Sequence, residues 1–165
     1  NLLKEKKHVR GIAKELNINH MMINRKMGEL MKENVVDFNQ EGKNKVYFLK
    51  ESFESDIYKI MAEEYYLIKL TNKYPILRKI TEEIRKDNKI KFAVLFGSYA
   101  KQTAGANSDI DIFVESKNKQ IKNDLKKINS KISVKLGEYN KENNLIKEIE
   151  KNHAIIKGFE EFYAK

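Results

Sequence analysis

Two aspartates form the pattern in this 165-residue sequence that most clearly suggests chemistry. Asp109 and Asp111 alternate with apolar residues over 109–114, so we expect them to share one face of a strand. Two like charges this close repel each other unless a cation compensates them. Mg²⁺ suits the pair, because it binds one or two carboxylates together with water and phosphate oxygens. Two such ions ~3.5–4 Å apart could clamp a phosphoryl group during its transfer.

A Gly-Ser pair precedes the aspartates and supplies features that an anion site needs. Residues 99–108, ten in number, separate Ser98 from Asp109. Gly97 lets a phosphate approach the backbone closely, and Ser98 adds a hydroxyl and an N–H at the start of an expected short helix. The apolar run 89–96 ends at this pair and predicts a buried strand. The alternative is a strand that happens to end in Gly-Ser before a solvent-facing aspartate pair.

The order Gly-Ser, ten residues, Asp-x-Asp resembles the DNA-polymerase-β-like nucleotidyltransferases, in particular the minimal nucleotidyltransferases of prokaryotes, over about residues 76–165. The resemblance implies that Gly97, Ser98 and Ser108 bind the triphosphate of ATP or another nucleoside triphosphate. It also implies that Asp109 and Asp111 are catalytic and hold two Mg²⁺. The expected reaction transfers AMP from ATP to a protein or small acceptor and releases pyrophosphate. Such proteins often pair with a small helical partner protein in toxin–antitoxin systems, so we expect a partner of that kind.

One strand departs from the pattern that the resemblance implies. Active members usually carry a third carboxylate on the neighbouring strand, as a base for the acceptor hydroxyl or as a metal ligand. The matching strand is expected over 131–139, and Lys135 stands where that carboxylate is expected. A bulge at Gly137 could turn Glu138 inward as a substitute. A second hypothesis follows: a DNA-binding transcriptional regulator whose nucleotidyltransferase module has lost turnover and senses nucleotide or holds a partner.

Residues 1–50 predict a separate module. Apolar residues recur at helical spacing over 9–16 and over 23–31, and the break between them includes Asn19, a good N-cap for the second helix. The apolar segments 35–38 and 45–49 flank a polar tip over 39–44, which predicts a β-hairpin.

These elements resemble a winged helix-turn-helix over residues 9–49. Ala13 stands at the small position where the helices cross, and Ile18 at the apolar position in the turn. Asn1-Leu2-Leu3 look like the end of an earlier helix.

The winged-helix resemblance implies contact with double-stranded DNA. In such folds, side chains early in the second helix reach base edges and cations of the hairpin contact phosphates. The candidates for these contacts are His20, Met21, Asn24, Arg25, Lys43 and Lys45. Residues 1–50 carry 11 Lys and Arg against six Asp and Glu, which suits an anionic partner. A dimerisation or protein-contact module would show the same pattern.

The whole chain is therefore expected to be an α+β protein. A winged helix-turn-helix at 1–50 joins, through a linker helix at 51–74, a small mixed-sheet α/β nucleotidyltransferase domain at 75–165. The linker helix has a broad apolar stripe, so it should pack on both modules or on a partner chain such as a second copy. Pro75 is placed to end this helix, and His153 is expected to pack or cap rather than to catalyse.

Composition excludes other classes. The sequence has no Cys, which rules out disulfide scaffolds, Cys-ligated zinc and thiol catalysis. Its apolar runs fall short of the ~20 residues that span a bilayer, and its start lacks a signal-peptide pattern, so we expect a cytoplasmic protein without a membrane partner. The net charge of +9 favours anionic partners, although a bias to Lys, Asn and Ile also reflects AT-rich coding.

Overall fold

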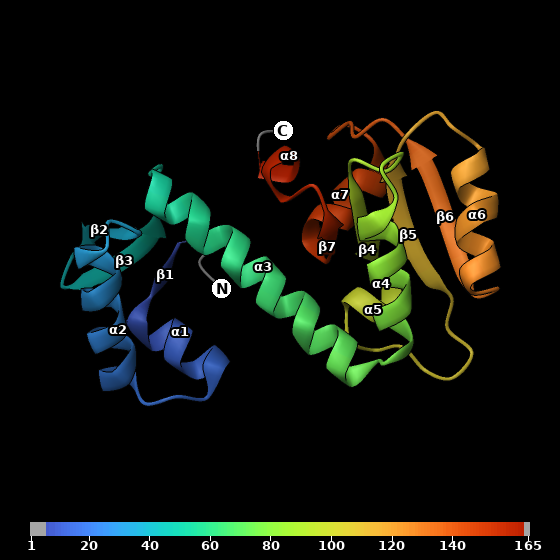
Figure 1. Cartoon of the computed structure of the whole chain (residues 1–165). Helices are drawn as coiled ribbons and strands as arrows, with labels where there is room; N and C mark the ends of the chain where they lie inside the picture. Colours follow the sequence, from blue (N-terminus) through green and yellow to red (C-terminus); the bar gives the residue numbers. More distant parts are fainter. Residues whose placement is uncertain (1–5, 164–165) are drawn as a thin grey trace. The chain divides into compact units, whose positions relative to one another are not determined.

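The computed structural model of the protein describes residues 6–163, and the chain divides into two compact units, Asn1–Ala62 and Glu63–Lys165 (Figure 1). The division falls inside the long helix α3 (Phe53–Lys73). The domain boundaries expected at residues 50 and 74 stay predictions. The helix end expected at Asn1-Leu2-Leu3 lies outside the described residues.

The N-terminal unit contains both expected helices, α1 (Val9–Leu16) and α2 (His20–Lys32). Asn17 ends α1 in the left-handed conformation, with φ 52°, and its backbone N–H donates to the last carbonyls of the helix. Asn19 caps α2 as expected, because its side chain accepts a 2.8 Å hydrogen bond from the backbone N–H of Met21. The short turn between the helices is therefore fixed at both ends by asparagine.

The hairpin of this unit is longer than its apolar residues predict. Strands β2 (Val36–Glu41) and β3 (Asn44–Leu49) pair through the polar segment that was expected to form the tip. Only Gly42 and Lys43 remain in the turn, and Gly42 has φ 58°, which a two-residue hairpin turn requires of a central residue. Backbone hydrogen bonds extend the ladder whatever the side chains are, so hydrophobicity underestimated its length.

A third strand, β1 (Lys7–His8), pairs with β3 and gives a sheet in the order β1-β3-β2. The core of the unit lies between this sheet and the two helices, and it consists of Ile12, Ala13, Ile23, Met27, Val35, Val36 and Tyr47. Ile18, expected as the apolar residue of the turn, is 40% exposed and is only partly covered.

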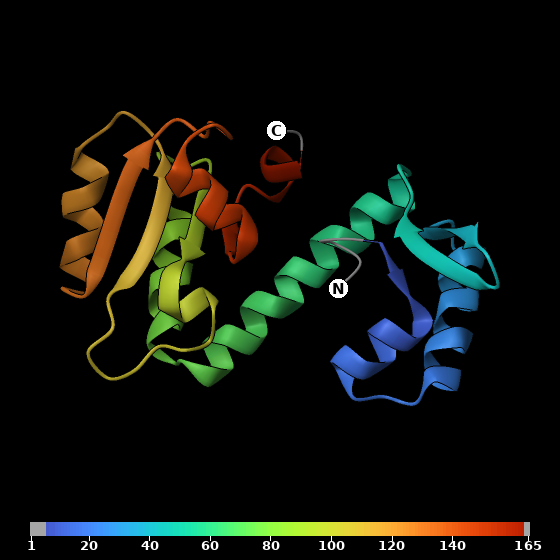
Figure 2. The ribbon, with the colours of Figure 1, turned by 180° about the vertical axis from the view of Figure 1, so that it is seen from behind.

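The C-terminal unit contains a four-stranded mixed sheet, as expected. Its strands are β4 (Ala93–Phe96), β5 (Ile110–Glu115), β6 (Ile132–Gly137) and β7 (Ala154–Lys157), in the order β6-β5-β4-β7. Strands β5 and β6 are parallel and lie side by side in Figure 2, whereas β4 pairs antiparallel with β5 and with β7. The parallel pair needs a crossover, which α6 (Gln120–Ile128) provides.

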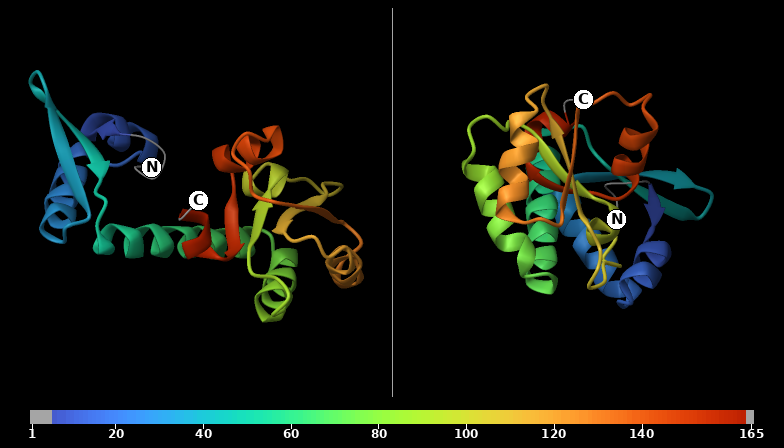
Figure 3. Two further views of the ribbon diagram at one scale, coloured as in Figure 1. Left: turned by 90° about the horizontal axis from the view of Figure 1, so that it is seen from above. Right: turned by 90° about the vertical axis from the view of Figure 1, so that its right-hand side faces the viewer.

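Helices cover both faces of this sheet (Figure 3). Helices α4 (Ile76–Lys86) and α6 pack on the face of Ile110, Ile112 and Val114. Helix α7 (Asn144–Lys151) packs on the opposite face, where Phe92, Val94, Phe113, Ile146 and Ile149 form a second buried cluster. Each fully buried aliphatic side chain contributes roughly 1.5–3 kcal/mol, so these two layers hold the strands in register.

One expected strand boundary differs from the structure. The strand expected over 89–96 begins only at Ala93, because a turn closes before it: the Ile90 N–H donates to the Asp87 carbonyl at 3.1 Å. Ile90 and Phe92 are nevertheless buried, so their apolar character reflects packing rather than pairing. Pro75 follows the end of α3 as expected and also begins α4.

Two shorter helices complete the unit, α5 (Gly97–Ala100) and α8 (Phe159–Tyr163). Over residues 6–163, no helix has both the length and the apolar character needed to cross a membrane.

Candidate functional site

Gly97 forms a tight corner between β4 and α5. Its φ of 69° lies in the left-handed region, which favours glycine. A Cβ atom placed on Gly97 would lie 2.4 Å from the Oδ2 atom of Asp111. The carboxylate therefore occupies the space that any other side chain would need. The fold brings Gly97 and Asp111 together across thirteen intervening residues, 98–110.

Strand pairing explains why Asp111 faces this corner. Asp111 pairs with Phe96 on β4 and with Ser133 on β6, so it lies in an inner strand at the level where β4 ends. Asp109 precedes β5 rather than belonging to it, and it is exposed. The two carboxylates are close enough that the charge of Asp109 raises the pKa of Asp111.

The surroundings of Asp111 make its charged form costly without a cation. Burial is the largest influence and raises the pKa of this carboxyl, while the hydrogen bond from Ser133 and the charge of Lys135 lower it. The net direction is upward. A carboxylate held in this way gains from a positive ion placed beside it.

Ser98 and Ser108 lie at the two ends of the loop that links the corner to β5. The Ser108 hydroxyl accepts a 3.0 Å hydrogen bond from the Gly105 N–H, and its own N–H donates to the Gly105 carbonyl at 3.1 Å. Ser108 therefore closes a turn in the structure. The Ser98 carbonyl accepts from the Thr103 N–H at 2.9 Å, and within the described residues its hydroxyl makes no hydrogen bond.

The residue opposite Asp111 on β6 is Ser133, whereas the sequence suggested Lys135 for the position of a third carboxylate. The parallel register pairs Lys135 with Phe113, one step further along the same face. Glu138 does not turn inward: it is exposed and forms a 2.8 Å ion pair with Lys117. The register could not be read from the sequence, because pairing between distant strands depends on tertiary packing.

The donor set fits a particular kind of metal ion. Among residues 6–163, no cluster of three or more His, Cys, Asp or Glu side chains could hold a metal by itself. Two carboxylates beside a glycine suit Mg²⁺ that arrives with phosphate oxygens. Mg²⁺ is commonly bound by one or two carboxylates, and water and phosphate oxygens supply its remaining ligands. The two aspartates therefore fit a metal ion that arrives with its substrate.

Comparison with known families supports the chemistry that this corner suggests. The model described as "Polymerase beta, Nucleotidyltransferase" matches residues 78–161, just over half of the chain. The chain belongs to this nucleotidyltransferase family. The matched region of the nucleotidyltransferase runs from α4 into α8 and includes the Gly97 corner and both aspartates. It confirms the nucleotidyltransferase part of the resemblance and a nucleotidyltransferase-type function. No curated protein matches the chain.

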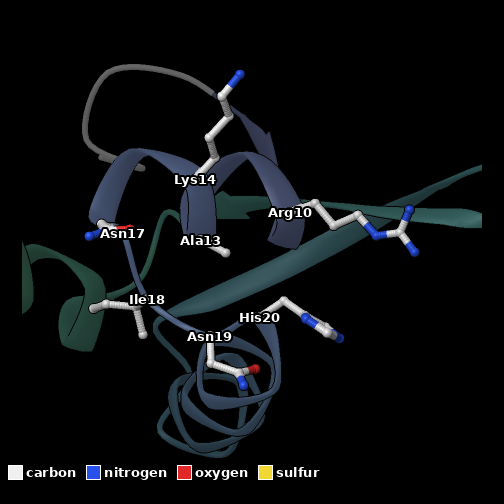
Figure 4. A pocket seen from close by; sticks show the side chains of 7 residues that line it. All are labelled: Arg10, Ala13, Lys14, Asn17, Ile18, Asn19 and His20. Atoms are coloured by element: carbon white, nitrogen blue, oxygen red, sulfur yellow. The ribbon is translucent and has the colours of Figure 1, made fainter.

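The N-terminal unit carries a second candidate site, an open pocket of about 450 Å³ beside the turn between α1 and α2 (Figure 4). Its lining is mostly basic and polar and consists of Arg10, Ala13, Lys14, Asn17, Ile18, Asn19 and His20. In Figure 4, the side chains of Arg10 on α1 and His20 on α2 extend in the same direction, while Lys14 points away. The sequence did not single out Arg10 or Lys14, although both lie on the exposed side of α1.

The residues expected to contact DNA are all exposed. His20, Met21, Asn24 and Arg25 lie on the first half of α2, opposite the buried Ile23 and Met27.

The two hairpin lysines differ in their surroundings. Lys43 lies in the exposed turn, and the Nζ atom of Lys45 lies 4.1 Å from the centroid of the Phe38 ring. A cation held over an aromatic ring is positioned by it, so Lys45 is the better oriented of the two.

Proposed function

We propose that the C-terminal unit transfers AMP from ATP, or the corresponding group of another nucleoside triphosphate, to an acceptor in a Mg²⁺-dependent reaction. The observation that carries this proposal is the Asp111 carboxylate packed into the space beside Gly97, with Asp109 next to it. A strand that merely ended in Gly-Ser would give no reason for a half-buried carboxylate to face the corner. Membership of the nucleotidyltransferase family supports the same chemistry.

Each residue of the corner has a role in this proposal. Asp109 and Asp111 would hold Mg²⁺, which would neutralise phosphate charge and orient the triphosphate. Gly97 allows the phosphates to approach the backbone, and the Ser98 hydroxyl can donate to a phosphate oxygen. Ser133 lies opposite Asp111 on β6, where its hydroxyl can donate to the carboxylate and orient it. Attack on the α-phosphorus would then release pyrophosphate.

The test is transfer of label from α-³²P-ATP in the presence of Mg²⁺ and candidate acceptors. Asp109→Asn with Asp111→Asn should reduce transfer by at least 100-fold, because both metal ligands are lost. Asp124→Asn is a matched control, since Asp124 lies on α6 and bonds Gln120 and Lys127. No transfer with any divalent metal, or equal loss in the control, would contradict the proposal.

For the N-terminal unit, we propose that it is a winged helix-turn-helix that binds double-stranded DNA. Three features support this proposal: the two helices are joined by a turn that asparagines cap, the hairpin pairs with a third strand, and the first half of α2 is exposed. Arg25→Ala should weaken binding to DNA at low salt by about tenfold, the size expected for one base contact worth ~1–3 kcal/mol. Lys32→Ala, at the opposite end of α2, is the control. Unchanged binding in Arg25→Ala would favour a protein-contact role.

The missing third carboxylate favours a second candidate function, a DNA-binding regulator whose nucleotidyltransferase module binds nucleotide without turnover. Nucleotide binding without transfer would distinguish this function from the first.

A protein partner, either a small helical protein or a second copy of the chain, remains part of the proposal. Its support is a set of large apolar side chains of α3 that are exposed: Phe53, Ile57, Met61, Tyr65 and Ile68.

A further inference from the structure

One face of α3 carries a row of large apolar side chains that solvent reaches. They recur at intervals of four, four, four and three residues, which keeps them on one side of a helix with 3.6 residues per turn. Each is between 41% and 77% exposed: Phe53, Ile57, Met61, Tyr65 and Ile68. We call these five residues the α3 stripe. Single exposed apolar residues are common, whereas a contiguous patch of them marks an interaction surface.

The stripe lies opposite the side chains that α3 buries in each unit. In the N-terminal unit the buried residue is Ser55, and in the C-terminal unit Leu67 and Leu70 are buried. Each of these three lies two positions from a stripe residue, and two positions turn a helix by about 200°. Each unit therefore packs on one side of α3, and the stripe occupies the other side.

The charges beside the stripe have opposite signs at its two ends. Glu54 lies in the first turn of α3, and Lys69 lies four residues after Tyr65. Both are exposed. The Glu54 side chain accepts a 2.9 Å hydrogen bond from the Asn34 side chain, and the Nζ atom of Lys69 lies 4.9 Å from the centroid of the Tyr65 ring. The stripe therefore has one negative and one positive end.

A second copy of α3 matches this pattern when the two helices run antiparallel. Met61 is the middle residue of the stripe, so two stripes aligned on it place Glu54 of one copy seven residues from the centre and Lys69 of the other copy eight residues from it. At 1.5 Å per residue, the two charges then lie about 1.5 Å apart along the helix axis. They also lie on the same side of the stripe, because fifteen residues turn the helix by about 60° beyond whole turns. A parallel pair would instead place like charges at the same level.

We propose that the α3 stripe binds the stripe of a second copy of this chain, with the two helices antiparallel and centred on Met61. Apolar burial drives the association, and the end charges set its direction and register. The inference rests on the protein partner included in the proposed function and commits that partner to a second copy. It needs neither nucleotidyl transfer nor DNA binding.

The mass of the full chain in solution tests the association. Sedimentation velocity over a hundredfold range of protein concentration should show a monomer and a dimer in equilibrium. Met61→Glu should raise the dissociation constant of the dimer at least tenfold, because it places two carboxylates at the centre of the pair. Met22→Glu on α2 is the matched control, since Met22 is 56% exposed and Met61 is 57% exposed. Circular dichroism checks that both variants are folded.

Two results of this measurement would overturn the inference. A monomer at every concentration would leave the stripe to a different partner, such as a small helical protein. An equal loss of association in Met22→Glu and Met61→Glu would show that the stripe is not the contact.

Charge reversal tests the direction of the pair. Glu54→Lys or Lys69→Glu alone should weaken the dimer by about fivefold, because each creates two contacts between like charges. The two changes together in one chain should restore the dimer, since each contact again joins opposite charges. Glu142→Lys, an exposed residue before α7, is the control for the same change of charge. Failure of the double variant to recover would contradict the antiparallel arrangement.

Introduced cysteines give an independent readout, because the chain has no Cys of its own. On mild oxidation, Met61→Cys chains should join through a disulfide, since the two positions meet at the centre. Phe53→Cys chains should not, because sixteen residues of helix, about 24 Å, would separate the two positions. Joining of both variants would show a parallel pair, and joining of neither would place the contact elsewhere; either result overturns the inference.

The proposed transfer is measured separately on the same samples with α-³²P-ATP and Mg²⁺. Absence of transfer in a chain that forms the antiparallel dimer would remove the proposed reaction and leave this inference intact. Transfer by a chain that stays monomeric would do the reverse.

Discussion

The two candidate sites differ in how the chain positions their residues. In the C-terminal unit, Asp111 is fixed by strand pairing on both sides and by contact with the Gly97 corner. In the N-terminal unit, Met21 and Arg25 extend from the exposed face of a helix, and nothing buried depends on them. The first site should therefore respond to changes of shape, and the second mainly to changes of charge.

The largest effect is expected at the corner. Gly97→Ala places a methyl group against the Asp111 carboxylate and forces a residue with a Cβ into the left-handed region. We expect at least a 100-fold loss of transfer and a loss of about 1–2 kcal/mol in unfolding free energy. Transfer assays and urea unfolding measure these effects. Gly105→Ala is the control, because nothing lies within 4 Å of its added Cβ. Similar losses in both variants would contradict the crowding argument.

The comparison of buried and exposed positions can be tested through stability alone. Ile112→Ala removes a fully buried side chain from the centre of the sheet and should lower the unfolding free energy by about 2–5 kcal/mol. Met21→Ala removes a side chain that is 69% exposed and should change it by less than about 0.5 kcal/mol. Urea unfolding followed by circular dichroism measures both changes. A large loss in the Met21 variant would show that α2 packs against something in solution.

A pH-dependent change in stability is expected at Asp111. Burial raises the pKa of Asp111 in the folded state, so its ionised form costs stability above that pKa, and the cost disappears below the unfolded value of about 4. Without metal, Asp111→Asn should therefore be more stable than the unmodified chain at pH 7 to 8. The difference should shrink toward pH 4. Thermal unfolding across this range measures it, and a difference independent of pH would contradict this explanation.

The smallest effects are expected at the hairpin lysines. Lys43→Ala removes an exposed cation and should not change the stability of the fold. It should reduce the slope of the logarithm of the DNA-binding constant against the logarithm of the salt concentration by about one, because one phosphate contact is lost. Lys45→Ala should have the same effect on binding and should also lower stability by about 0.5–1 kcal/mol, because Lys45 lies over the Phe38 ring. Binding at several salt concentrations, together with thermal unfolding, compares the two. Equal stability of both variants would show that the ring contact contributes nothing.

Local patterns predicted the parts of the fold that depend on neighbouring residues. Alternation over 109–114 predicted the strand of Asp111, and Asn19 was identified correctly as a helix cap. The apolar stripes predicted both helices of the N-terminal unit near their true bounds. Each of these features is encoded within a few residues, and the structure changes only their ends.

Features that depend on distant residues could not be predicted in the same way. The sequence could not show that Ser133, and not Lys135, pairs with Asp111, because a shift of register leaves the alternation unchanged. Pairing of β1 with β3 joins residues about 40 positions apart. The pocket near Arg10 likewise forms only when α1 and α2 pack together.

The position of β6 has a further consequence. Within the part of the chain that the structure describes, it is the last strand of its sheet and has one neighbour, β5. An edge of this kind presents open N–H and C=O groups that a strand from another molecule could join. Charged side chains at such an edge discourage this joining, and Lys131 and Lys135 are both exposed there. Replacing these lysines with apolar residues would then make the chain prone to self-association and aggregation, whatever happens to its chemistry.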